Sequence, residues 1–66
     1  MTSRKVIFHC LENNEIESTF TMDCTSAAEG QKIAKALVGT SIGLGIIMSA
    51  EIWNITDNQI EGVIAV

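Results

Sequence analysis

The residues best suited to chemistry are His9, Cys10 and Cys24, because histidine and cysteine supply zinc ligands and catalytic nucleophile–base pairs. His9 and Cys10 are neighbours in an apolar run that is typical of a strand, so their side chains point to opposite faces of a sheet. A tetrahedral zinc site needs four ligands, and the sequence holds no further Cys or His. We therefore expect neither a metal site nor a Cys–His catalytic pair.

The two cysteines are also badly placed for a disulfide. In the hairpin predicted below, Cys10 lies opposite a residue near positions 16 to 18, so Cys24 lies six or more residues further along. At about 3.3 Å per residue this separation is roughly 20 Å, whereas a disulfide needs Cα atoms within about 7 Å. We expect two reduced thiols, as is usual for a cytosolic protein.

A glycine-rich run, Gly39-x-x-x-Gly43-x-Gly45, resembles phosphate-binding loops in composition. Such loops lead from a strand into a helix N-terminus, whose free N–H groups bind the anion. Here the run follows a predicted helix, where the dipole is negative, and no Lys comes after it. We interpret it as a helix cap and connection, and we expect no cofactor and no small-molecule substrate.

The charge of the chain argues against nucleic acid as a direct ligand. The formal net charge is −4, and the eight acids are balanced only by Arg4, Lys5, Lys32 and Lys35. A nucleic-acid or anionic-membrane binder needs clustered Lys and Arg. The acids are scattered apart from Glu12, Glu15 and Glu17 around the first turn, and they form no general acid–base pair. We therefore expect a protein that is not an enzyme.

The size and composition predict one small globular domain, residues 1–66, with 47% apolar and 18% charged residues. Domains of this size are marginally stable, and oligomerisation is a common remedy. The uncharged stretch from Ala36 to Ala50 is shorter than the roughly 20 residues that span a bilayer. The apolar run near the N-terminus is short and interrupted by His9, unlike a signal peptide. We expect a soluble, cytoplasmic protein.

Residues 25–39 predict an amphipathic helix, and the other elements must form the surface that it covers. Ser26 and Glu29 fit the S-x-x-E capping box, and Gly39 suits the left-handed position that ends a helix. Gly30 on the apolar side predicts a close approach of the helix to its partner. The whole apolar stripe consists of Ala27, Gly30, Ile33, Ala34, Leu37 and Val38.

Four strands are predicted around this helix, over residues 5–11, 16–22, 45–56 and 59–66. The order is ββαββ, and the simplest packing is an antiparallel four-stranded sheet with one helix across one face, an α+β fold. Nothing in the sequence fixes the strand order.

In the first hairpin, a two-residue loop at Asn13-Asn14 would place Ile7, His9 and Leu11 on one face with Phe20, Ser18 and Ile16. The other face would then hold Val6, Phe8 and Cys10 with Thr21, Thr19 and Glu17. A loop of three or five residues would invert this assignment.

In the second hairpin, a two-residue turn at Asp57-Asn58 would pair Trp53 with Gly62, so that the indole ring covers the bare backbone. Both faces of this hairpin are then apolar, although one helix can cover only one face. The row on the uncovered face predicts an interaction site made of Trp53, Ile55, Ile60, Ile64 and Val66.

These features favour a non-enzymatic protein–protein interaction module, a homodimer or a chain bound to a protein partner through its open sheet face. In size, charge and architecture the chain also resembles small phage- or prophage-encoded inhibitors, anti-CRISPR proteins among them. That resemblance implies an alternative function, in which the acidic protein blocks a nucleic-acid-handling machine by occupying its basic groove.

Overall fold

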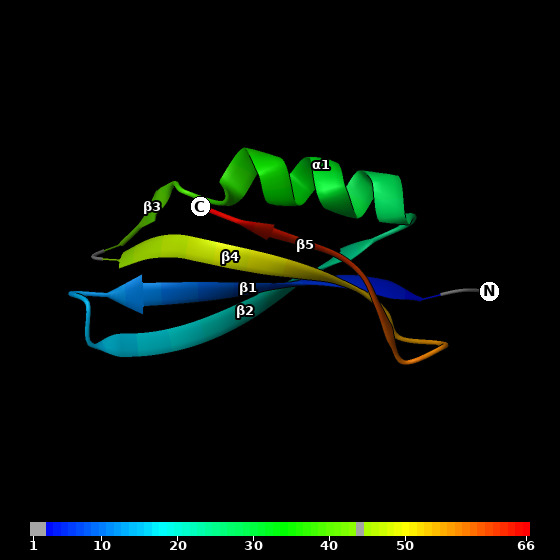
Figure 1. Cartoon of the computed structure of the whole chain (residues 1–66), viewed down its shortest axis with the longest axis horizontal. Coiled ribbons are helices and arrows are strands. Elements are labelled where there is room, and N and C mark those ends of the chain that lie inside the picture. Colours follow the sequence, from blue (N-terminus) through cyan, green and yellow to red (C-terminus); the bar gives the residue numbers. More distant parts are fainter. Residues whose placement is uncertain (1–2, 44) are drawn as a thin grey trace.

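A computed structural model describes residues 3–43 and 45–66, and it shows one helix lying across a twisted antiparallel sheet (Figure 1). Strand β4 is central: it pairs with β1 on one edge and with β3 and β5 on the other, while β2 pairs with β1. The predicted α+β, ββαββ fold is confirmed, and the two-residue β3 is an addition within the glycine-rich connection. The elements are β1 (Arg4–Glu12), β2 (Ile16–Cys24), α1 (Ala27–Leu37), β3 (Ser41–Ile42), β4 (Gly45–Asn54) and β5 (Gln59–Ala65).

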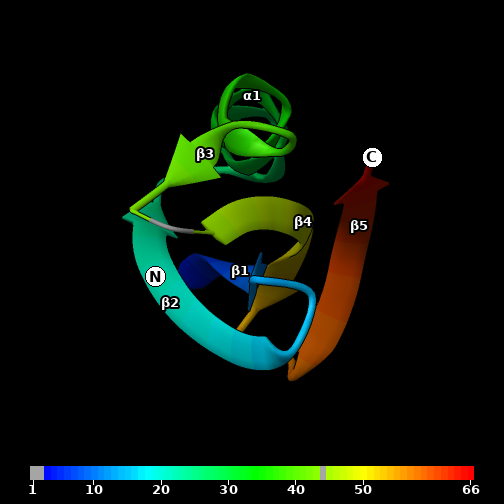
Figure 2. The ribbon, with the colours of Figure 1, turned by 90° about the vertical axis from the view of Figure 1, so that its left-hand side faces the viewer.

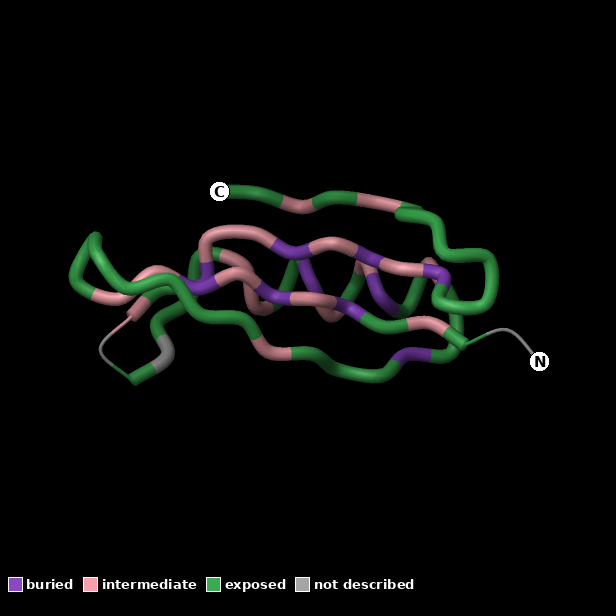
Figure 3. Tube along the Cα trace, turned by 90° about the horizontal axis from the view of Figure 1, so that it is seen from below, coloured by how far each residue is buried: buried purple, intermediate pink, exposed green. Residues whose placement is uncertain are grey.

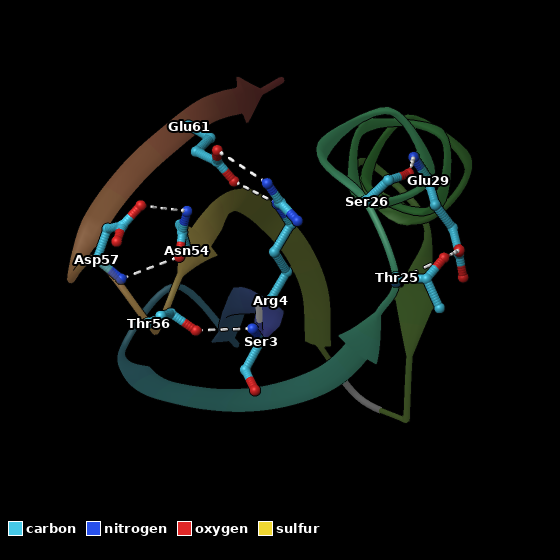
Figure 4. Close-up of polar contacts among 9 residues, drawn as sticks. All are labelled: Ser3, Arg4, Thr25, Ser26, Glu29, Asn54, Thr56, Asp57 and Glu61. Atoms are coloured by element: carbon cyan, nitrogen blue, oxygen red, sulfur yellow. Dashed lines mark hydrogen bonds and ion pairs between the residues drawn. The ribbon is translucent and has the colours of Figure 1, made fainter. Parts of the chain in front are cut away.

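Helix α1 begins and ends where the sequence predicts. Ser26 is the N-cap, and its hydroxyl accepts a hydrogen bond of 3.1 Å from the backbone N–H of Glu29. The Glu29 carboxylate in turn accepts bonds from the backbone N–H and the hydroxyl of Thr25 (Figure 4). Beyond the C-cap Val38, Gly39 adopts a φ of 90°, a conformation that favours glycine.

The predicted apolar stripe of α1 faces the sheet. Gly30 and Ala34 are buried, and Ile33, Leu37 and Val38 pack against the core. A Cβ atom on Gly30 would lie only 2.9 Å from Cγ2 of Ile52. The close approach predicted from this glycine is therefore confirmed.

The core lies between α1 and the two central strands, as the end-on view shows (Figure 2). Four side chains of β1 and β4 are fully buried: Val6, Phe8, Ala50 and Ile52. Along both strands buried residues alternate with partly exposed ones (Figure 3). Strand β2 differs, because all of its residues are exposed except Phe20, which stacks on Phe8 with ring centroids 4.7 Å apart, and Cys24.

The first hairpin has a three-residue loop, so the register expected for a two-residue loop is wrong. Asn13 and Asn14 do adopt positive φ values, 53° and 59°, and the N–H of Glu15 bonds the carbonyl of Glu12 at 3.0 Å. However, Glu12 pairs with Ile16, which leaves Glu15 as an extra loop residue. The inverted assignment therefore holds: Val6, Phe8 and Cys10 share the helix side with Met22, Phe20 and Ser18, while Ile7, His9 and Leu11 share the open face with Thr21, Thr19 and Glu17.

The second hairpin has a four-residue turn, residues 55–58, so its predicted register is also wrong. The buried Asn54 causes the wider turn, because its Oδ1 accepts a 3.0 Å bond from the N–H of Asp57 and its Nδ2 donates to Asp57 at 3.1 Å (Figure 4). Trp53 consequently pairs with Ile60, and a register shift between Ile52 and Trp53 then places Gly62 opposite Ile52 on the helix side. The predicted Trp53–Gly62 pair does not form.

Candidate interaction surface

The five residues predicted as an interaction row do not share one face. Trp53 and Ile60 lie opposite each other on the open face of the sheet, the face that α1 does not cover. Ile64 pairs with Ala50 and packs against the core on the helix side. The row was derived from the two-residue turn. Widening that turn by two residues keeps the faces of β5, but the register shift between Ile52 and Trp53 moves Ile64 to the other face.

The remaining two residues of the predicted row lie outside the strands, Ile55 directly after β4 and Val66 directly after β5. Ile55 is 44% exposed within the turn, and its backbone N–H bonds the carbonyl of Ser3 at 2.8 Å. Val66 follows β5, with its N–H bonded to the carbonyl of Met48, and a Cβ on Gly39 would contact its side chain. Their role in binding stays a prediction, separate from the open face.

Four apolar residues form what we call the open-face cluster: Ile7, Trp53, Ile60 and Val63. They lie in two neighbouring rows that run across the strands of the sheet. In one row Ile7 and Val63 pair with Glu51 from either side, and in the next row Ile60 pairs with Trp53. Val63 is 60% exposed and Ile60 is 47% exposed, whereas Ile7 and Trp53 are half-buried. Sequence reasoning missed Ile7 and Val63: the predicted second hairpin placed Val63 on the face opposite the row, and Ile7 was not assigned to an interaction site.

Glu51 lies between the apolar residues of this cluster. Its Oε1 accepts a 3.3 Å hydrogen bond from Nε1 of Trp53 and lies 3.3 Å from Nε2 of His9. The bond from Trp53, followed by that from His9, holds the pKa of the Glu51 carboxyl below its ordinary value. The carboxylate is therefore ionised at neutral pH, and it fixes the orientation of the indole ring.

A hollow of about 600 Å³ is lined by residues of β1, β2 and β4, none of which belongs to the open-face cluster. It lies where the pairing of β1 with β4 shifts register between His9 and Cys10. Its lining is mixed in polarity and includes His9, Leu11, Thr19, Met48 and Ser49. Within residues 3–43 and 45–66, no group of three His, Cys, Asp or Glu side chains is placed to hold a metal ion.

Both cysteines are buried free thiols. Cys10 pairs with Ser18 and Cys24 with Arg4, which places them six positions apart along the first hairpin. Burial, with a contribution from Glu29, raises the pKa of the Cys24 thiol. Cys24 is therefore protonated at neutral pH and is a packing residue rather than a nucleophile.

The charged side chains are divided between structural contacts and the molecular surface. Arg4 reaches across β4 to Glu61, with its Nε 2.7 Å from Oε1, and this contact lowers the pKa of Glu61 (Figure 4). Lys5 lies 3.9 Å from Asp23. The other two cations, Lys32 and Lys35, are exposed on α1, while Glu15 and Glu17 are exposed at the tip of the first hairpin. The hairpin tip is therefore acidic, while the open face carries the cation Lys5 opposite Trp53 as well as the acids Glu17, Asp23 and Glu51.

Neither the protein-family models nor the curated proteins and solved structures with which the chain was compared give a match. In the part of the chain that the structure describes, no helix is both long and apolar enough to cross a membrane.

Proposed function

We propose that this protein is a non-enzymatic interaction module that binds a protein partner through the open-face cluster. The observation that supports the proposal is the cluster itself: two half-buried and two exposed apolar side chains gather on a sheet face that no element in the described structure covers. Exposed apolar patches on small soluble domains commonly mark interaction sites.

The partner surface that fits this cluster is apolar and carries Lys or Arg. The cluster holds Glu51, an ionised carboxylate whose indole and imidazole neighbours bond only one of its two oxygens in the described structure. A basic side chain of the partner would pair with this carboxylate, and the net charge of −4 favours encounter with a basic surface. Trp53 supplies the rigid aromatic anchor that interfaces often use.

Site-specific photo-crosslinking tests this proposal. A photoreactive amino acid at Val63 should capture the partner in cells, whereas the same group at Lys35, on the outer side of α1, should not. With the purified partner, Val63→Lys and Ile60→Lys should each weaken binding at least tenfold, because they place a charge inside an apolar interface. Lys35→Ala serves as the matched control.

Two results would contradict the proposal. One is equal capture from Val63 and Lys35, and the other is unchanged affinity for Val63→Lys. Val63→Lys and Ile60→Lys each change an exposed side chain, so the far-UV circular dichroism of both variants should match that of the original protein. Loss of binding then reports on the surface and not on the fold.

A second candidate function is an inhibitor that occupies the nucleic-acid groove of a larger machine. The observation that favours it is the acidic tip of the first hairpin, where Glu12, Glu15 and Glu17 lie within one turn and its flanking strand residues. Under this hypothesis, nucleic acid displaces the protein from its partner, and changing the three tip residues to Gln abolishes inhibition. If nucleic acid and the protein bind the partner together, the first function is favoured.

A further inference from the structure

We propose that the free edge of β2 pairs with the β2 edge of a second copy of the chain, forming a two-fold symmetric dimer with one continuous sheet. This inference concerns a different surface from the open-face cluster, and it holds whether or not that cluster binds a partner.

Besides the two-residue β3, the outer strands of the sheet are β2 and β5, and they differ in how well they resist such pairing. β5 is seven residues long, contains Gly62, and its pairing with β4 is interrupted by a register shift. β2 is nine residues long and pairs with β1 in one unbroken register. It contains no Lys, Pro or bulge, which commonly protect an edge strand, and its charged residues are the two acids Glu17 and Asp23.

β2 also carries apolar side chains that the domain leaves uncovered. On the helix side, Ile16 is 57% exposed and Met22 is 40% exposed, and Phe20 between them is only half-buried. The reason is that α1 lies over β4, β1 and β5 and extends little over β2 (Figure 2). Phe20, in the middle of this apolar lane of Ile16, Phe20 and Met22, stacks sideways on Phe8 of the neighbouring strand.

Symmetry restricts how two β2 strands can pair. In an antiparallel pair, directly opposed residues point to the same face of the sheet. A two-fold axis between two β2 strands must therefore pass midway between one residue and the same residue of the second copy. An axis at Phe20 would place Glu17 opposite Asp23 of the second copy, and like charges directly opposite are destabilising. An axis at Thr21 would leave Ile16 outside the paired segment.

An axis at Thr19 gives a self-complementary pairing of residues 16–22. It places Ile16 opposite Met22 of the second copy, Ser18 opposite Phe20, and Glu17 opposite Thr21. The two most exposed apolar side chains of the lane then cover each other, a small residue faces the large Phe20, and no acid faces an acid within the paired segment. We therefore infer that Thr19 lies at the dimer axis.

The mass in solution is the first test. By light scattering after gel filtration, the protein should have twice the chain mass of 7.1 kDa. Thr19→Lys should give a single-chain mass, because it brings two ammonium groups together at the axis. Val63→Lys, on the open face and away from β2, is the matched control and should remain dimeric.

A charge-rescue experiment removes the concern that Thr19→Lys merely unfolds the chain. Mixing Thr19→Lys with Thr19→Glu should restore the dimer, since opposite charges then meet at the axis, while neither variant dimerises alone. A monomeric original protein at millimolar concentration would overturn the proposal. A dimer that survives Thr19→Lys, or one that Val63→Lys dissociates, would overturn it as well.

Disulfide trapping tests the register. Thr19→Cys should crosslink two chains under mild air oxidation, because opposed Cα atoms in an antiparallel pair are about 4.5–5.5 Å apart. Thr21→Cys should not crosslink, since residue 21 of one copy lies opposite Glu17 of the other copy and not opposite residue 21. The original chain is the control for crosslinking through the buried Cys10 and Cys24. Crosslinking of Thr21→Cys in place of Thr19→Cys would overturn the assigned axis.

Discussion

The two faces of the sheet are built from alternating residues of the same strands, yet they differ sharply in burial. On the helix side, Phe8 and Ile52 are completely buried, while their open-face neighbours Ile7 and Trp53 are only partly covered. An α-helix is about 10 Å wide and strands are about 4.8 Å apart, so one helix covers about two strands. The difference shows that a domain with a single helix builds its core on one face and leaves the side chains of the other face partly exposed.

Truncating two residues that are adjacent in the sequence but lie on opposite faces should produce the largest difference in lost stability between the faces. Phe8→Ala should lower the free energy of unfolding by about 3–5 kcal/mol, because it removes a fully buried ring and leaves a cavity. Ile7→Ala should cost no more than about 1.5 kcal/mol, since its side chain is already partly in water. Urea denaturation measures both values, and equal losses would show that the open face is covered in solution.

Two glycines on the helix side should respond differently to a methyl group. Gly30→Ala should destabilise the protein by about 1–2 kcal/mol although alanine favours a helix, because the new Cβ would lie 2.9 Å from the buried Ile52. Gly62→Ala should change the stability by less than about 0.5 kcal/mol, since the nearest atom belongs to the flexible side chain of Gln31, at 3.3 Å. Thermal melting of both variants decides the point, and a stabilised Gly30→Ala would show that α1 can lift from the sheet.

Loss of the helix cap should weaken the covered face moderately. Ser26→Ala removes the hydroxyl that accepts the N–H of Glu29, and it should lower the free energy of unfolding by about 1 kcal/mol. Ser26→Asp, which keeps an acceptor at the N-cap, is the control and should restore most of the loss. An unchanged denaturation midpoint for Ser26→Ala would mean that the cap contributes nothing in solution.

The smallest effect should be a pH dependence on the open face. The folded pKa of Glu51 lies below its ordinary value of 4.5, so this group stabilises the fold above pH 4.5, and the contribution is lost as the pH falls through the folded pKa. Trp53 is the only tryptophan, and its fluorescence should therefore follow this titration with a midpoint below 4.5. Glu51→Gln should remove the transition and Glu61→Gln should keep it; a midpoint above 4.5 would refute the assignment.

The helix and the order of elements along the chain were predictable because each has a strong local signal. Ser26 and Gly39 mark the ends of α1 as predicted, whereas the carboxylate of Glu29 bonds Thr25 and not the N-cap N–H of the predicted capping box. Gly30 also gave a correct prediction of close packing, because glycine is a poor helix former and its one advantage on an apolar stripe is the missing side chain.

The two hairpin registers were not predictable from turn composition, and the interaction row depended on one of them. Asn13 and Asn14 form the expected tight turn, but nothing local indicates that Glu15 joins the loop. In the second hairpin a signal existed: Asn54 and Asp57 are three residues apart, the spacing at which an Asn side chain bonds a backbone N–H. A shift of one residue exchanges the faces of a strand, so the open-face cluster could be identified only from the structure.

The central position of β4 also determines when the chain can fold during synthesis. β1 and β2 leave the ribosome first, but the strand that joins β1 to the rest of the sheet spans residues 45–54. Until that segment has emerged, the first hairpin has two open edges and α1 has no complete surface to cover. At about 5–20 residues per second, this interval lasts a few seconds. The nascent chain therefore exposes its apolar hairpin before the domain closes, which makes this the stage at which chaperones would act.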